Sequence, residues 1–199
     1  MKTYTVKNTI NDILKDELLM KRFQFMMPKE FLDIVPAELR KEEIESLQDK
    51  LRMPWGAPYL GSEIVDVANK VYEISFDDRF ELIKLWAEDI EEDYFPSGKE
   101  EDSVCLIRFK ESFQKGRPIA IIVPGGAYHD VAIANEGMEV AAELMKLGYA
   151  VAVLNYRVTP NHYPLPQMDL ALAIKYMRYH ASEYGVLDNI MTVGFSAGG

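Results

Sequence analysis

Three short apolar runs in the second half of the chain limit what it can fold into. They span residues 119–123, 149–154 and 190–193, and runs of this length are typical of strands buried on both faces. Two segments with apolar residues at helical spacing, 135–147 and 165–184, separate the runs. Strand and helix therefore alternate, which predicts an α/β fold with a mostly parallel sheet and helices on both of its faces.

Two segments upstream alternate between apolar and polar residues, as half-buried strands do. Residues 71–76 and 80–86 flank an Asp-Asp pair, so we expect them to form a hairpin. Residues 91–102 are acidic and contain Pro-Ser-Gly, which indicates a surface loop, and residues 103–109 are expected to form another strand.

The first 70 residues differ from the rest and predict a helical extension. Thr9 stands where it can cap a first helix, and the apolar residues of that helix are Ile10, Ile13, Leu14 and Leu18. Pro36 is positioned to open a second helix, with an apolar face formed by Ile44, Leu47 and Leu51. Residues 62–70 fit either a helix or a strand. We therefore divide the chain into a helical extension, residues 1–70, and an α/β part, residues 71–199.

The composition is that of a globular protein and excludes several classes. Hydrophobic residues make up 48% of the chain and charged residues 27%, which argues against a disordered or coiled-coil protein. The net charge of −10 disfavours phosphate backbones, so we expect no nucleic-acid partner. No apolar run approaches the ~18 residues that span a bilayer, and the first residues lack the apolar core of a signal peptide. We therefore expect a cytoplasmic protein without membrane association.

The last apolar run leads directly into a glycine-rich turn around a serine, Gly194-Phe195-Ser196-Ala197-Gly198. A serine hydroxyl becomes a nucleophile when it is held clear of its own backbone and beside a base. A sharp strand-to-helix turn with the pattern G-x-S-x-G presents the serine in this way, and its crowded flanking positions favour glycine. Ser196 is therefore the candidate nucleophile. The alternative is a glycine-rich turn in which Ser196 only caps a helix.

A second glycine-rich turn, Pro124-Gly125-Gly126-Ala127-Tyr128, follows the first apolar run. Acyl transfer needs backbone N–H groups that approach the developing oxyanion, and small residues leave the backbone accessible. Serine hydrolases of the G-x-S-x-G type take one such donor from the residue after the nucleophile and another from a loop after an earlier strand. The order of the two turns along the chain fits this arrangement.

Four motifs in this order resemble the acetyl-esterase and feruloyl-esterase-like branch of the α/β-hydrolases, which is related to the hormone-sensitive-lipase-like carboxylesterases. They are the Pro-Gly-Gly-Ala-Tyr turn, Asn155-Tyr156-Arg157-Val158, Tyr163-Pro164-Leu165-Pro166 with Asp169, and Gly-Phe-Ser-Ala-Gly-Gly. The resemblance implies that residues 71–199 are the first part of an α/β-hydrolase catalytic domain. This sequence departs from the family at Pro124, where many relatives have a structural histidine.

The resemblance also implies a function and a set of site residues. It implies a serine esterase that cleaves small acyl esters, often acetyl groups on sugars, without a cofactor or a metal ion. Carried over by position, the oxyanion donors are the backbone N–H groups of Gly126, Ala127 and Ala197. For Arg157 and Asp169 we expect structural roles, with Asp169 in the first turn of a helix, where a carboxylate is favoured.

The catalytic acid and histidine of this fold follow the nucleophile in sequence, yet three residues follow Ser196. We therefore expect the chain to be a fragment of a longer enzyme. The three histidines, His129, His162 and His180, precede the serine, and none stands at the family's position for the general base. Cys105, the single cysteine, lies in an apolar segment, and we expect a buried hydrophobe rather than a catalytic thiol.

Two other functions share the G-x-S-x-G turn. One is a serine peptidase of the prolyl-oligopeptidase type, although no propeller repeat is present, and the other is a non-catalytic scaffold of the same fold.

Two placements of residues 1–70 also stay open. The extension could form a cap that shapes the acyl or alcohol pocket, as its aromatic residues suggest: Phe23, Phe25, Trp55 and Tyr59. It could equally pack on the back of the sheet or at the interface of a homo-oligomer.

Overall fold

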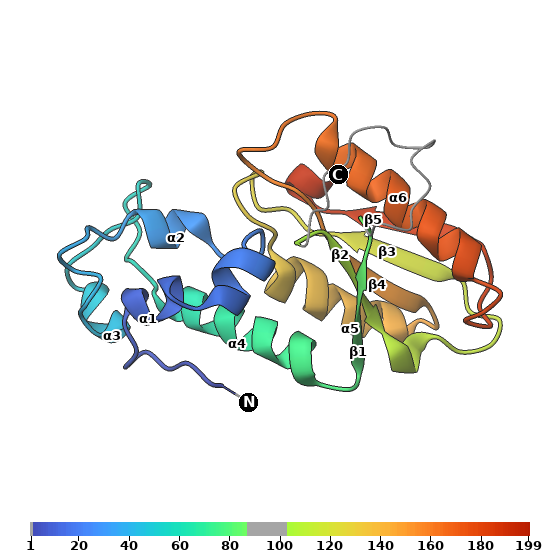
Figure 1. Ribbon diagram of the computed structural model, residues 1–199, viewed down its shortest axis with the longest axis horizontal. Coiled ribbons are helices and arrows are strands. Elements are labelled where there is room, and N and C mark those ends of the chain that lie inside the picture. The colour runs from blue at the N-terminus through green and yellow to red at the C-terminus, as the bar shows by residue number, and fades with distance from the viewer. Residues whose placement is uncertain (1, 87–102) are drawn as a thin grey trace.

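A mixed sheet forms the centre of the molecule (Figure 1) in the computed structural model, which describes residues 2–86 and 103–199. Its order is β1-β2-β4-β3-β5. The strands are β1 (Phe80–Lys84), β2 (Cys105–Phe109), β3 (Ile119–Val123), β4 (Ala150–Asn155) and β5 (Ile190–Gly194). Strands β4, β3 and β5 run parallel, whereas β2 is antiparallel to both β1 and β4.

The three parallel strands are the apolar runs of the sequence, which confirms the predicted alternation of strand and helix. Every residue of β3 and β4 is buried, because helices cover both faces of the sheet. A π-helical turn, Ile133–Glu139, continues into α5 (Val140–Lys146) on one face, and α6 (Leu165–His180) covers the other. The helix predicted over residues 165–184 ends earlier, at His180.

Residues 2–76 form a helical unit beside the sheet (Figure 1). Its elements are α1 (Ile10–Leu14), the π-helical turn Leu18–Arg22, α2 (Lys29–Asp33), α3 (Ile44–Leu47) and α4 (Ser62–Phe76). Thr9 caps α1 as predicted: its side chain accepts a hydrogen bond from the Asp12 N–H, and the Asp12 carboxylate accepts one from the Thr9 N–H. Most buried apolar residues of this unit share one continuous core with α5 and a face of the sheet.

Two local predictions for the first 80 residues are wrong. Residues 71–76 are the end of α4 rather than a strand, because Ile64, Ala68 and Val71 continue one buried helical face into them. The predicted hairpin therefore does not exist, and β1 pairs with β2 instead. Residues 62–70, for which helix and strand were both open, belong to α4, so the proposed boundary at residue 70 falls inside a helix.

Pro36 does not open the second predicted helix. That helix is reduced to the single turn α3, which starts at Ile44, because Glu43 pairs with Thr9 in an isolated β-bridge. The Ile44 N–H accordingly donates to the Asn8 carbonyl, 2.9 Å away. The surface loop predicted over residues 91–102 lies outside the described residues. Within the described part of the chain, none of the helices has both the length and the apolar character needed to cross a bilayer.

A buried carboxylate ties the beginning of the chain to α4. Asp16 is 8% exposed and accepts hydrogen bonds from the hydroxyls of Tyr4 and Tyr72, at 2.6 and 2.7 Å. The ammonium of Lys2 lies 2.6 Å from the same oxygen. Burial alone would raise the pKa of Asp16, but these hydrogen bonds hold it well below its usual range. The carboxylate therefore stays charged and joins three segments of the helical unit.

We expect Asp16→Ala to lower the free energy of unfolding by about 3 kcal/mol, because two buried hydroxyls lose their acceptor. Tyr72→Phe should cost about 1 kcal/mol. Since the folded-state pKa of Asp16 is depressed, the wild type loses stability as the pH falls below about 4, the value in the unfolded chain. Urea denaturation between pH 3 and 7 measures both effects. An Asp16→Asn variant with the same loss of stability at low pH as the wild type would contradict this assignment.

Candidate active site

The candidate residues gather at one edge of the sheet, because parallel strands end on the same side. The loops after β3, β4 and β5 begin at Pro124, Tyr156 and Phe195, and β3 lies between β4 and β5 in the sheet. In open α/β sheets, ligands bind outside these carboxyl ends of the strands. The two glycine-rich turns are therefore neighbours in space, although about 70 residues separate them in sequence.

Ser196 lies in a strained backbone conformation between β5 and a short 3₁₀ turn, Ser196–Gly198. Its φ is +47°, a value that non-glycine residues rarely adopt and that is common at functional sites. The Phe195 N–H donates to the Val123 carbonyl at 3.1 Å, and the Gly198 N–H donates to the Phe195 carbonyl at 2.7 Å. These bonds fix the turn against the end of β3, and Ser196 remains exposed.

Steric crowding explains the two glycines of the G-x-S-x-G pattern. A Cβ at Gly194 would collide with the carbonyl oxygen of Gly198, and a Cβ at Gly198 would collide with that of Val123. Both obstacles are backbone atoms, which cannot move without opening the turn. The turn around Ser196 can therefore close only with glycine at both positions.

The loop after β3 passes directly beside the serine. A Cβ at Gly125 would lie 2.9 Å from the Cβ of Ser196 and 2.9 Å from the Phe195 carbonyl oxygen, so only glycine permits this approach. Gly126 and Ala127 follow with φ of +131° and +52°. The Gly126 carbonyl accepts the N–H groups of His129 and Asp130, at 2.8 and 3.2 Å, which closes a tight turn.

The N–H groups of this loop have different partners. The Gly125 N–H donates to a carboxylate oxygen of Glu136 at 2.6 Å, whereas the N–H groups of Gly126 and Ala127 donate no hydrogen bond within residues 2–86 and 103–199. Ala197, the third donor inferred by resemblance, lies in the 3₁₀ turn that begins at Ser196. Glu136 was not singled out from the sequence. Its position in the first turn of the helix after the loop was the available signal.

Arg157 and Asp169 form a buried ion pair next to this edge. Asp169 is fully buried, and its carboxylate accepts the Arg157 N–H at 2.9 Å, the Arg157 Nη2 at 2.7 Å and the Trp86 Nε1 at 2.8 Å. The expectation that Asp169 belongs to the first turn of a helix is wrong, because that turn contains no acidic residue. The carboxylate instead holds the loop after β4 to α6 and to Trp86.

The three histidines take separate positions. His129 and His162 are exposed, in the loops after β3 and β4. His180 ends α6, and its Nδ1 lies 2.7 Å from the Glu183 carboxylate. None of them hydrogen-bonds to Ser196 among the described residues. Cys105 is buried as expected, and burial raises the pKa of its thiol to about 12.

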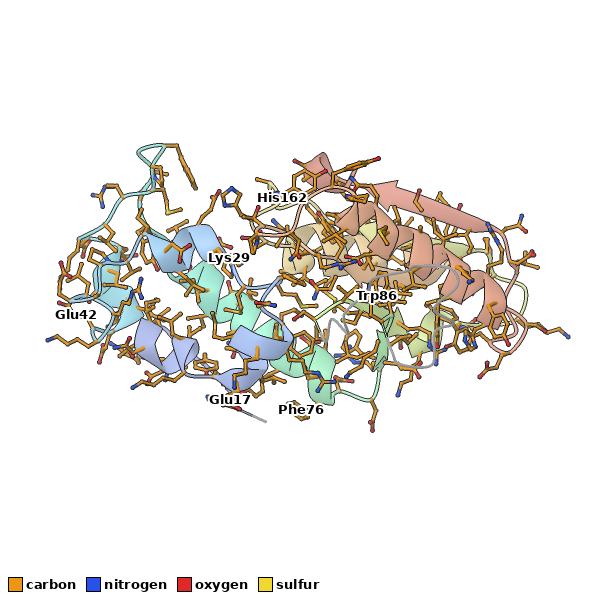
Figure 2. The ribbon with its side chains drawn as sticks, turned by 45° about the horizontal axis from the view of Figure 1, so that its top comes forward. Glu17, Lys29, Glu42, Phe76, Trp86 and His162 are labelled. Atoms are coloured by element: carbon orange, nitrogen blue, oxygen red, sulfur yellow. The ribbon has the colours of Figure 1, made fainter. Side chains whose placement is uncertain are left out.

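The helical unit reaches the same edge of the sheet. The Val131 N–H donates to the Phe25 carbonyl at 2.6 Å, and Phe25 itself is buried in the core on the α6 side of the sheet. Lys29 of α2 donates to the carbonyl of Thr159, in the loop after β4, at 2.8 Å. Figure 2 labels Lys29 and, from the loop of Thr159, His162. Among the described residues, no group of three or more Asp, Glu, His or Cys side chains is suited to bind a metal ion.

Comparisons with known proteins find that the α/β part is similar to esterases. The family model BD-FAE matches residues 107–199. Esterase LipC of Mycobacterium tuberculosis is 35% identical over 94 residues, which are 46% of this chain and 23% of that protein. An acetylxylan esterase of Xylanibacter ruminicola is 32% identical over 95 residues, 47% of this chain and 20% of that protein.

The fold has a counterpart among solved structures. An acetyl ester-xyloside bifunctional hydrolase from Caldicellulosiruptor lactoaceticus superimposes with a TM-score of 0.53 at 31% identity, over 60% of this chain and 44% of that one. The matched part of this chain spans about a quarter or less of the length of the two curated relatives. The matched residues, 107–199, contain both glycine-rich turns, and this part of the chain is similar to esterases.

Proposed function

We propose that the full-length protein containing this chain is a serine esterase and that Ser196 is its nucleophile. The observation that carries the proposal is the strained turn at Ser196, with the glycine-rich loop after β3 in contact with it. A strained serine at the carboxyl edge of a sheet costs stability, and such strain is typical of sites where a side chain must be presented to a ligand. The esterases among the relatives support the same reaction.

In the proposed reaction, the Ser196 hydroxyl attacks the carbonyl carbon of an ester, and a general base removes its proton. The backbone N–H groups of Gly126, Ala127 and Ala197 then donate to the oxyanion of the tetrahedral intermediate. The free N–H groups of Gly126 and Ala127 support this role, because a donor already in use could not stabilise new charge. None of the three histidines hydrogen-bonds to Ser196 among the described residues, so we assign the general base to none of them.

We propose small acyl esters, in particular acetyl esters of carbohydrates, as the substrates. The names of similar proteins support this choice: one relative is an acetylxylan esterase, and one structural neighbour is an acetyl ester-xyloside hydrolase. We also propose that the helical unit, residues 1–70 extended to the end of α4, acts as a cap. The contacts of Phe25 and Lys29 with the loops after β3 and β4 favour this placement over one confined to the back of the sheet.

Replacing the serine tests the proposal directly. We expect Ser196→Ala in the full-length protein to lower kcat for p-nitrophenyl acetate by at least ~10³-fold, because no other group can form the acyl-enzyme. Circular dichroism controls for folding. Equal hydrolysis by the variant would exclude the nucleophile. A wild type that cleaves peptide substrates but no esters would favour the peptidase, and one that cleaves neither would favour the scaffold.

Glu136 provides a second test, as a positioning residue that acts through Gly125. We expect Glu136→Ala to lower kcat about 10-fold or more with little change in KM, because the oxyanion loop loses the bond that fixes it. Glu136→Gln keeps an acceptor oxygen and should recover most of the rate. Exposed Glu139 on the same helical turn is the matched control, and Glu139→Ala should behave as the wild type. A Gln variant as slow as the Ala variant would contradict the positioning role.

A further inference from the structure

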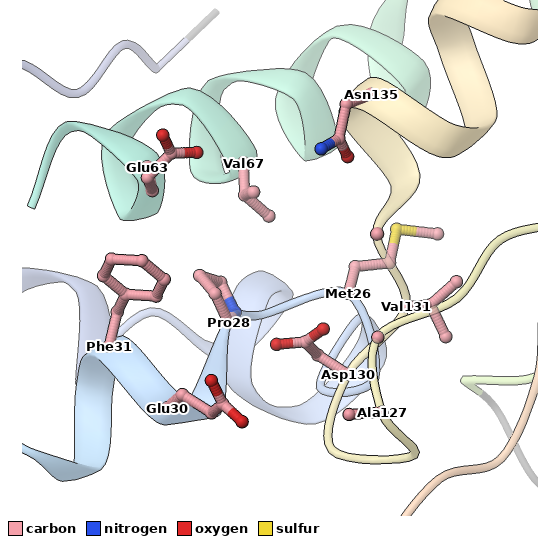
Figure 3. Close-up of a pocket in the computed structure, with 12 residues that line it drawn as sticks. Met26, Pro28, Glu30, Phe31, Glu63, Val67, Ala127, Asp130, Val131 and Asn135 are labelled. Atoms are coloured by element: carbon pink, nitrogen blue, oxygen red, sulfur yellow. The ribbon is translucent and has the colours of Figure 1, made fainter. Parts of the chain in front are cut away.

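A pocket of about 270 Å³ lies where the helical unit meets the loop after β3. Three parts of the chain line it: residues 26–31, α4, and residues 126–135 (Figure 3). The pocket is smaller than the roughly 300–1,000 Å³ of sites for drug-sized ligands. Its size therefore suits a ligand of about one sugar ring rather than a polymer segment or a large aromatic compound.

The polar side chains of the pocket are three carboxylates, which accept hydrogen bonds, and one amide, which can accept and donate. They belong to Glu30, Glu63, Asp130 and Asn135, from the three parts of the chain that line the pocket. Burial, together with the charge of nearby Glu30, raises the pKa of Asp130 to about 7. Further negative charge is therefore unfavourable here, which argues against an anionic ligand. Carboxylates accept hydrogen bonds from hydroxyl groups, so a neutral polyol is compatible with all of these groups.

Apolar side chains form the remaining wall of the pocket. They include Met26, Pro28, Phe31, Val67 and Val131, and Figure 3 shows Val67, on α4, across the pocket from Asp130. The combination of apolar surface with a few converging acceptors is what a pyranose ring requires. Its C–H groups pack against apolar atoms, and its hydroxyls donate to carboxylates.

The pocket adjoins the proposed reaction centre. Gly126 and Ala127, whose N–H groups are the proposed oxyanion donors, line it, and the preceding Gly125 is in contact with Ser196. We propose that this pocket binds the sugar ring of an acylated carbohydrate substrate, with Glu30 and Asp130 accepting hydrogen bonds from the ring hydroxyls. This inference rests on the proposed esterase function and assigns the selection of the alcohol part to the helical unit.

Substrate selectivity in the full-length protein tests the subsite. We compare kcat/KM for an acetylated methyl xyloside with kcat/KM for p-nitrophenyl acetate, which lacks ring hydroxyls. Glu30→Ala should lower the ratio of the two values about 10-fold, because a hydroxyl of the sugar loses a charged acceptor. Glu30→Gln, which keeps an acceptor, should lower it less. Exposed Asp33 on the same helix is the matched control, and Asp33→Ala should leave the ratio unchanged.

The outcomes separate this inference from the proposed function. If the wild type hydrolyses both esters through Ser196 and the ratio is insensitive to Glu30→Ala, the subsite is refuted and the esterase stands. A rise in the ratio, or a preference for long-chain acyl esters that is lost in Phe31→Ala, would make the pocket an acyl site and would also refute the inference. Hydrolysis that persists in Ser196→Ala would instead overturn the proposed function.

Discussion

The close approach of the turn after β5 to the loop after β3 is the contact on which the rest of the site depends. Three positions without a Cβ make it possible: Gly194 and Gly198 let the turn close on itself and on β3, and Gly125 lets the neighbouring loop reach Ser196. Backbone atoms are the obstacles at Gly194 and Gly198, so side-chain rearrangement could not relieve a larger residue there, and at Gly125 the obstacles include the Phe195 carbonyl oxygen and the Cβ of Ser196. The strained φ of Ser196 is maintained because the turn after β5 and the loop after β3 both hold its backbone in place.

In the proposed function, the helical unit extends this arrangement from the candidate nucleophile to the substrate. Asp16 holds its first residues to α4, α4 shares a core with one face of the sheet, and Phe25 and Lys29 reach the loops after β3 and β4. A segment anchored in this way presents a fixed wall next to the reacting groups. Fixed walls favour selectivity, because little conformational entropy is lost when a ligand binds.

The sequence was sufficient to predict the parts of the site that depend on local chain geometry. The apolar runs were correctly predicted to be strands, and the sheet order places the ends of β3 and β5 side by side. The roles of Ser196 and of the three backbone donors stay predictions. Prediction failed where a pattern had two solutions, as in residues 71–76, whose apolar residues fit both a strand and the end of α4. It also could not reveal contacts between distant segments. The bonds from Glu136 to Gly125 and from Phe25 to Val131, and the pocket between them, depend on tertiary packing.

We propose that the turn and the loop together present a nucleophile beside backbone donors that are free within the described part of the chain. The most direct measurement is a crystal structure of the full-length protein after reaction with a fluorophosphonate. The account predicts a phosphonyl group on Oγ of Ser196, with its oxygen about 2.7–3.1 Å from the backbone nitrogens of Gly126, Ala127 and Ala197. An unmodified Ser196, or an adduct whose phosphonyl oxygen points to solvent away from these three nitrogens, would contradict it.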